Sequence, residues 1–179
     1  MERRTLLKCL LLVAGGSAVL PACLHKQSKA SIVLNNMQVS AEQEATLGEI
    51  AETLIPASAT PGAKDTYAHL YALRMLDDCY EKEEQETFLK GLKAVDELTK
   101  EKHNTSFAAA SAAQKKGIVS VLEAKKASAD AQAFYQLMKQ LTIQGYTTSK
   151  PVMGAIFKYE LVPGRYVPAF PAKAIIHQA

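Results

Sequence analysis

Apolar residues recur at the spacing of an α-helix in successive stretches between residues 40 and 144, and no stretch alternates apolar and polar residues as a half-buried strand does. A period of 3.6 residues gives each stretch one apolar face, and such faces are buried against one another. The pattern therefore argues against a sheet or barrel. We expect an all-α fold, a compact bundle of about five to six helices with an extended C-terminal tail.

Local signals predict where these helices begin and end. Ser40 with Gln43, and Ser111 with Gln114, have the spacing of a capping box, which predicts a helix start at each serine. The expected helices cover residues 40–55, a second stretch through 70–80, then 82–102, 111–126, 130–144, and a short one from Pro151 to Tyr159. The inward side chains are expected to be Leu47, Ile50, Ala51, Leu54, Leu70, Leu73, Leu76, Tyr80, Phe88, Leu92, Val95, Ile118, Leu122, Phe134, Leu137, Met138 and Leu141.

Four further residues are typical of helix ends and turns. Asp65 follows a loop rich in Pro and Gly and is expected to be the N-cap of the second helix. Gly145 is expected just beyond the C-terminus of the fifth helix. Pro163 and Gly164 suit the central positions of a type II turn, which predicts that the helical pattern has ended before them.

The first 20 residues have the features of an export signal. A charged start precedes an apolar run at 10–20, which is far shorter than the roughly 20 residues of a transmembrane helix. The stretch ERRTLLK, with Arg3 and Arg4, resembles the twin-arginine export motif. The general export route remains the alternative, because paired arginines also occur in ordinary signals.

The signal ends in LPAC, which resembles a bacterial lipobox with Cys23 as the lipidated residue. Two or more acyl chains would anchor the protein firmly to a membrane. The alternative is a soluble protein cleaved near Ala22. The expected domains are a signal at 1–23, a tether at 24–39 and a helical domain at 40–179.

The cysteine count leaves no intramolecular disulfide in the mature domain. Cys9 leaves with the signal, and if the lipobox is real Cys23 is lipidated, so only Cys79 then remains. Cys79 falls in a helix with an apolar stripe, and we expect it to be buried in the core.

Charge and composition exclude several functions. The chain has 21 Lys and Arg against 18 Asp and Glu, and removing Arg3, Arg4, Lys8 and Glu2 with the signal leaves 18 against 17. A nearly neutral domain has no electrostatic footprint for nucleic acid. The sequence contains no glycine-rich phosphate loop, haem motif or His pair at metal-binding spacing.

The neighbouring carboxylates Asp77 and Asp78 do not point toward each other on a helix. We therefore interpret them as one paired and one solvated side chain, not as an acid–base pair. An independent enzyme would need a pocket with converging titratable groups, and the sequence gives little sign of one.

Four stretches in order carry a resemblance to a known family: LIPASATPGAKD (54–65), MLDDCY (75–80), LTIQGYTTS (141–149) and LVPGRY (161–166). Together they make the region 42–171 similar to the gluconate 2-dehydrogenase subunit 3 family, the small subunits of FAD-dependent sugar and polyol dehydrogenases. The resemblance implies a non-catalytic subunit that binds, stabilises and escorts a large, folded flavoprotein subunit through twin-arginine export into the periplasm. It places FAD in that partner and no cofactor in this chain.

The resemblance also implies a partner interface. It is expected to include Tyr146, Tyr159, Pro163, Gly164, Arg165 and Tyr166. Tyr and Arg are the usual anchors of protein interfaces. A cytochrome c is a candidate electron acceptor for the partner enzyme.

Two departures from the family pattern qualify these expectations. A lipid on Cys23 would let this chain tether the complex to the membrane itself. Many relatives have a cysteine shortly after the VPGRY motif, whereas this chain has Val167, Pro168 and Ala169, so a covalent link to the partner there is not expected. The alternative function is an independent envelope lipoprotein with a binding or structural role.

Overall fold

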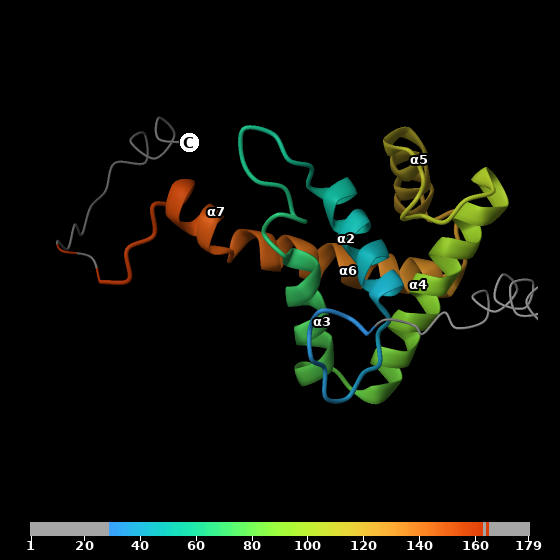
Figure 1. The fold of residues 1–179 in the computed structure, drawn as a ribbon, viewed down its shortest axis with the longest axis horizontal. Helices are drawn as coiled ribbons and strands as arrows, with labels where there is room; N and C mark the ends of the chain where they lie inside the picture. Colours follow the sequence, from blue (N-terminus) through green and yellow to red (C-terminus); the bar gives the residue numbers. More distant parts are fainter. Residues whose placement is uncertain (1–28, 163, 165–179) are drawn as a thin grey trace, which may run out of the picture.

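The computed structural model describes residues 29–162 and Gly164, and within this part of the chain it has six α-helices and no strand (Figure 1). The helices are α2 (Ala41–Leu54), α3 (Ala68–Cys79), α4 (Lys82–His103), α5 (Ala112–Glu123), α6 (Ala129–Thr147) and α7 (Lys150–Ala155). The expected all-α fold is therefore confirmed. The tail expected after Gly164 lies outside the described residues.

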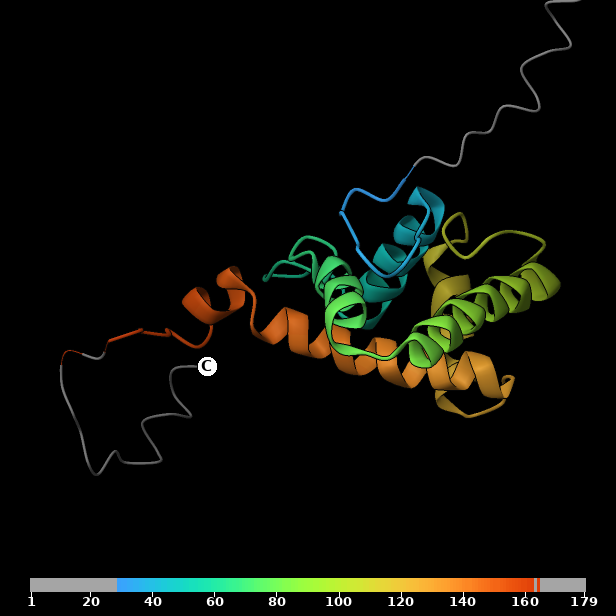
Figure 2. The ribbon, with the colours of Figure 1, turned by 90° about the horizontal axis from the view of Figure 1, so that it is seen from below.

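Helix α6 is the centre of the bundle. It runs along the length of the molecule and packs against both α3 and α4 (Figures 1 and 2). At its crossing with α4, the rings of Phe88 and Phe134 lie 4.7 Å apart between centroids. A Cβ atom at Gly91 would lie 2.3 Å from Phe134 Cβ and 2.4 Å from the Asp130 carbonyl oxygen, so only glycine permits this close crossing.

The predicted apolar stripes form the core. Most of their side chains are buried: Leu47, Ile50, Ala51, Leu73, Leu76, Phe88, Leu92, Val95, Ile118, Leu122, Phe134, Met138 and Leu141. The remaining stripe residues, Leu54, Leu70, Tyr80 and Leu137, are partly buried against them. Phe107, in the loop before α5, is also fully buried, and its backbone N–H donates to Asp96 Oδ1 at 2.9 Å.

Both predicted capping boxes form. The Ser40 hydroxyl accepts from the Gln43 N–H at 3.2 Å, and Gln43 Oε1 accepts from the Ser40 N–H at 2.9 Å. Ser111 and Gln114 make the same reciprocal pair. The helices that start at these boxes begin where the sequence predicts, because both signals act within one turn of the helix.

The predictions that Asp65 begins one helix and that Gly145 ends another were wrong. Helix α3 starts at Ala68 after Tyr67, which has a φ of 57°, and Asp65 instead accepts the Gly62 N–H at 3.2 Å. Gly145 does not end α6 but lies inside it, where an added Cβ would come within 2.8 Å of Tyr71 Cδ1. The residue types suited caps, but a local turn and a contact between α3 and α6 decide their roles.

The last helix is shorter than expected. Pro151 lies in the first turn of α7 as predicted, but α7 ends at Ala155 and not at Tyr159. Lys158 then adopts a φ of 47°, and the Tyr159 N–H donates to the Met153 carbonyl at 3.0 Å. Helix α7 and the residues after it project from one end of the bundle (Figures 1 and 2).

Residues 29–39, which the sequence assigns to the tether, pack against the bundle, and we call them the N-terminal strap. Met37 and Val39 in the strap are 6% and 8% exposed. The Ala30 N–H donates to the Val39 carbonyl at 3.2 Å, which closes the strap into a loop. The strap lies on the face of the bundle opposite α6 (Figure 2).

A buried carboxylate fixes the strap to α3. Asp77 accepts the backbone N–H groups of Asn35, Asn36 and Met37 at 2.7 to 2.8 Å. Burial alone would raise the pKa of Asp77, but these three donors outweigh it, and the pKa lies below its ordinary value. Asp78 is exposed and lies 3.9 Å from Arg74, so the two carboxylates differ in environment, but the buried one is bonded to backbone N–H groups and the ion pair is made by the exposed one.

Cys79 is exposed, and the expectation that it is a core residue was wrong. It is the last residue of α3, next to the exposed Asp78 and beside the stripe formed by Leu73 and Leu76. The error arose because cysteine is usually buried, whereas the position of Cys79 on the helix lies outside the apolar stripe.

Candidate partner interface

Within residues 29–162 and Gly164, no three His, Cys, Asp or Glu side chains form a group that could hold a metal ion. In the same residues, no helix has the length and apolar character needed to cross a membrane. His69 is buried beside Gly48, and burial lowers its pKa. The candidates for a functional surface are therefore the exposed side chains.

Large exposed apolar side chains gather at the end of the molecule where α7 projects. Phe157 is 58% exposed, and Leu161 and Val162 are more than 80% exposed. Among the described residues, those at this end are Tyr67, Ile143, Ile156, Phe157, Tyr159, Leu161 and Val162. We call residues 156–162 the C-terminal arm. An apolar surface of this kind marks an interaction site more often than a scatter of single residues does.

A cleft of about 390 Å³ lies near the arm, between the start of α3 and the junction of α6 and α7. Tyr67, just before α3, and Tyr71 in α3 line one side of it, and Lys150 and Pro151 of α7 line another. Gly145 lines it from α6, and the lack of a side chain there lets Tyr71 pack closely against the helix. Apolar walls with a few polar groups are typical of a pocket that receives a partner's side chain.

The predicted interface residues are only partly brought together. Tyr146, in the last turns of α6, is partly buried against the core, and its hydroxyl lies 3.3 Å from the Thr60 hydroxyl. Tyr159 is 57% exposed on the arm, and Gly164 is also exposed. The remaining predicted site residues, Arg3, Arg4, Cys23, Pro163, Arg165 and Tyr166, lie outside the described residues.

Sequence reasoning missed most of the exposed apolar set. It assigned residues up to Tyr159 to a helix and did not single out Phe157 or Leu161. The run IFKYELV contains a signal that could have found them, because its apolar residues follow the last helix that the sequence predicts. Tyr67 gave no comparable signal, since only the fold brings it to this end.

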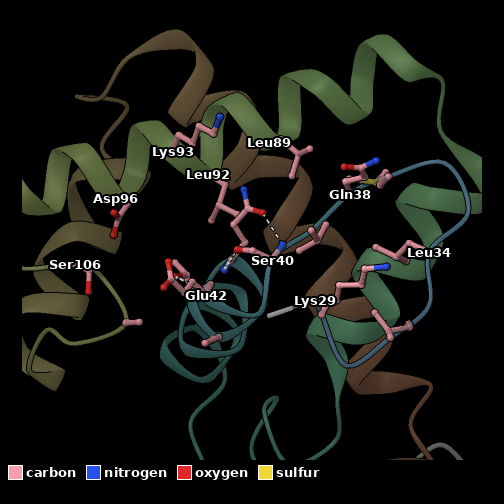
Figure 3. Close-up of a pocket in the computed structure, with 18 of the residues that line it drawn as sticks. Lys29, Leu34, Gln38, Ser40, Glu42, Leu89, Leu92, Lys93, Asp96 and Ser106 are labelled. Atoms are coloured by element: carbon pink, nitrogen blue, oxygen red, sulfur yellow. Dashed lines mark hydrogen bonds between the residues drawn. The ribbon is translucent and has the colours of Figure 1, made fainter. Parts of the chain in front are cut away.

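A second hollow, of about 1340 Å³, lies between the strap, the start of α2 and one side of α4 (Figure 3). Leu89 and Leu92 form part of its apolar wall. Its charges balance: Lys29, Lys93 and Lys100 line it together with Glu42, Asp96 and Glu97. Lys100 pairs with Asp96 at 2.6 Å, so this hollow does not present a concentrated charge of one sign to a ligand.

Comparison with protein families decides what kind of protein carries this fold and surface. A family model for gluconate 2-dehydrogenase subunit 3 matches residues 41–164, which is most of the chain. The chain belongs to this family. A gluconate 2-dehydrogenase subunit 3 is by its name an accessory subunit of a dehydrogenase. The search for similar curated proteins and the search for similar solved structures found no match.

The match includes all six helices and the C-terminal arm of this subunit 3 protein. It starts at Ala41, so the N-terminal strap precedes the matched region. The family relationship therefore applies to the bundle and the arm, and it gives no information about the role of the strap.

Proposed function

We propose that this chain is the non-catalytic small subunit of an FAD-dependent sugar or sugar-acid dehydrogenase. It binds and stabilises the folded flavoprotein, escorts it through twin-arginine export and holds it at the membrane through a lipid on Cys23. The family match over residues 41–164 carries the proposal. FAD belongs to the partner, because this sequence has no glycine-rich loop for a dinucleotide pyrophosphate.

The C-terminal arm and the nearby cleft are the proposed contact surface. Phe157, Tyr159, Leu161 and Val162 expose apolar area that the bundle does not cover. Burying this apolar area against a partner would favour association by about 25 cal/mol for each Å² removed from water. Exposed aromatic side chains on this extension are suitable anchors, because truncating a central anchor typically costs about 2 kcal/mol or more of binding free energy.

The escort role predicts that both proteins depend on one signal. Replacing Arg3 and Arg4 by lysine should block export of this chain and of the flavoprotein together, because the twin-arginine route requires the arginine pair. Periplasmic and cytoplasmic fractions would be probed for both proteins. Undiminished export of the lysine variant would contradict the twin-arginine route.

The decisive experiment is affinity purification from membranes of the native host, followed by a visible spectrum and mass spectrometry. The tag belongs in the exposed loop at 124–126, at the end of α5 and away from the C-terminal arm (Figure 1). A flavin spectrum with a large co-eluting dehydrogenase is expected. A colourless protein that elutes alone would contradict the escort role and favour the independent envelope lipoprotein.

The substrate of the partner and its electron acceptor would follow from the same sample. A co-eluting cytochrome c would identify the acceptor by its haem absorption. Reduction of the flavin band by gluconate, other sugar acids or polyols, tested one at a time, would identify the substrate class.

A further inference from the structure

The N-terminal strap shortens the connection between the folded domain and the proposed lipid anchor. Only residues 24–28 separate Cys23 from Lys29, where the strap begins. An extended chain spans at most about 3.3–3.6 Å per residue, so Lys29 lies within about 20 Å of the anchor. A free tether running to Val39 would instead reach beyond about 50 Å by the same rule.

The strap is firmly attached, so the chain leaves the domain at a fixed point. Asp77 holds the backbone of Asn35, Asn36 and Met37. At the other end of the strap, both the N–H and the hydroxyl of Ser31 donate to the Glu44 carboxylate at 2.6 Å. Because both parts of the strap are held, an anchor at Cys23 would restrict the orientation of the domain as well as its distance.

The outer side of the strap is suited to a membrane surface. Val33 is 78% exposed, and Asn35, Asn36 and Gln38 beside it are exposed and uncharged. Residues 29–39 include Lys29 and no acidic residue, and the charge of Asp77 is buried and bonded to the strap backbone. An apolar side chain with a neighbouring lysine is typical of a surface that lies at the lipid headgroups.

We propose that the strap face of the domain lies directly on the lipid bilayer, with Val33 at the level of the headgroups. This inference rests on the lipid anchor of the proposed function and adds an orientation to it. Because the strap lies opposite α6 and the arm projects from the end of the bundle, both α6 and the arm remain accessible (Figure 2). The flavoprotein would then be held close to the membrane, whereas a long flexible tether would leave its distance from the membrane variable.

The test measures how close two positions come to the lipid. The full-length precursor carries Cys79→Ser with either Val33→Cys or Gln140→Cys, the latter at an exposed position on α6. The fluorophore is attached to the introduced cysteine only after Cys9 has left with the signal and Cys23 has been lipidated. The mature, lipidated proteins are placed in vesicles of phosphatidylethanolamine and phosphatidylglycerol that carry a nitroxide at the headgroup. We expect several-fold stronger quenching at position 33 than at position 140. Equal quenching at the two positions would overturn the proposal.

A second variant tests whether the short connection causes this orientation. A flexible Gly/Ser insertion between Ser28 and Lys29 should reduce the difference in quenching between positions 33 and 140. An undiminished difference would contradict the short connection as its cause. If the flavoprotein covers the strap instead, it would protect position 33 from a soluble quencher while lipid quenching is equal at both sites, which overturns the proposal.

Failure of the proposal and failure of the proposed function give different results. The mass of the N-terminal peptide shows whether Cys23 carries a lipid, and an unmodified Cys23 would overturn both the bilayer contact and the membrane tether. Co-purification of the flavoprotein is scored separately in the same preparation. A lipidated protein that retains the flavoprotein but shows equal quenching would overturn the strap orientation alone.

Discussion

The N-terminal strap and the C-terminal arm are both short segments outside the helices, and each carries several apolar residues, but their surroundings differ. Met37 and Val39 of the strap are less than 10% exposed. Leu161 and Val162 of the arm are more than 80% exposed. The strap backbone is held by Asp77, whereas the arm extends from the end of the bundle (Figure 2).

This difference separates what the fold needs from what a partner needs. The strap completes the core, so changes there should lower the stability of the domain. The arm exposes apolar side chains at no benefit to the isolated domain, so changes there should leave stability intact and affect association.

Asp77→Ala should have the largest effect on stability. The variant removes one charged acceptor from three backbone N–H donors, and hydrogen bonds to charged groups contribute about 1.5–3 kcal/mol each. We expect the free energy of unfolding to fall by about 3 kcal/mol in total, because Asn35 and Asn36 are exposed and their freed N–H groups reach water. Urea unfolding of the mature domain measures this loss.

Asp78→Ala is the matched control for Asp77→Ala. Asp78 is the next residue of α3, is exposed, and lies 3.9 Å from Arg74. Surface ion pairs contribute little, so its loss should change the free energy of unfolding by less than about 0.5 kcal/mol. Equal losses in the two variants would show that the strap is not held by Asp77.

Phe157→Ser combined with Leu161→Ser should weaken partner binding and leave the domain stable. Both side chains are exposed in the isolated domain, so truncating them leaves no cavity in the core. We expect at least about a tenfold loss of affinity for the flavoprotein, which corresponds to about 1.4 kcal/mol. Titration of the purified flavoprotein with the variant measures the affinity, and urea unfolding measures the stability.

The control for this pair lies in the same arm. Lys158→Ser with Glu160→Ser changes two polar residues between the apolar ones and should affect binding much less. If the apolar pair binds the flavoprotein as tightly as the original protein, the arm is not the contact surface.

How far the sequence predicts these features depends on how local their causes are. The capping boxes at Ser40 and Ser111 depend on residues three positions apart, and both were predicted correctly. The apolar stripes depend on a period within one helix, so the core positions such as Phe88 and Met138 were also predicted. These features need no knowledge of how the helices are arranged.

The features that were missed depend on contacts between distant residues. Gly145 looked like a helix end, but its role is to let Tyr71 approach α6. Asp77 accepts hydrogen bonds from strap residues about 40 positions away in sequence, and no local sequence pattern predicts that contact. Tyr67 and the arm come to the same end of the molecule only through the packing of α3, α6 and α7. The candidate site was therefore less predictable than the fold.

The attachment of the strap should weaken in acid. The pKa of Asp77 in the folded protein lies below its value in the unfolded chain, so its stabilising effect is present above about pH 4 and is lost as the pH falls through the folded-state pKa. The difference in unfolding free energy between the original protein and Asp77→Asn should therefore shrink as the pH is lowered. Glu49 and Glu123 also have lowered pKa values, but they are present in both proteins and cancel in the difference.

A difference in unfolding free energy that stays constant between neutral pH and about pH 3 would contradict the role of the ionised Asp77 carboxylate in holding the strap. It would indicate that the strap is held by burial of Met37 and Val39 alone. Hydrogen exchange at the backbone amides of 35–37 gives an independent measurement, because their protection should decline over the same pH range.

Tyr146 and Tyr159 provide the smallest test, since the comparison predicts that one serves the fold and the other the partner. Tyr146→Phe removes only the hydroxyl that meets Thr60 at 3.3 Å, so we expect a loss of about 0.5–1 kcal/mol in unfolding free energy and unchanged affinity for the flavoprotein. Tyr159→Ala, 57% exposed, should instead preserve stability and weaken binding. The opposite result, with Tyr146→Phe weakening binding and Tyr159→Ala weakening the fold, would show that the arm packs on the bundle and that the contact surface lies on α6.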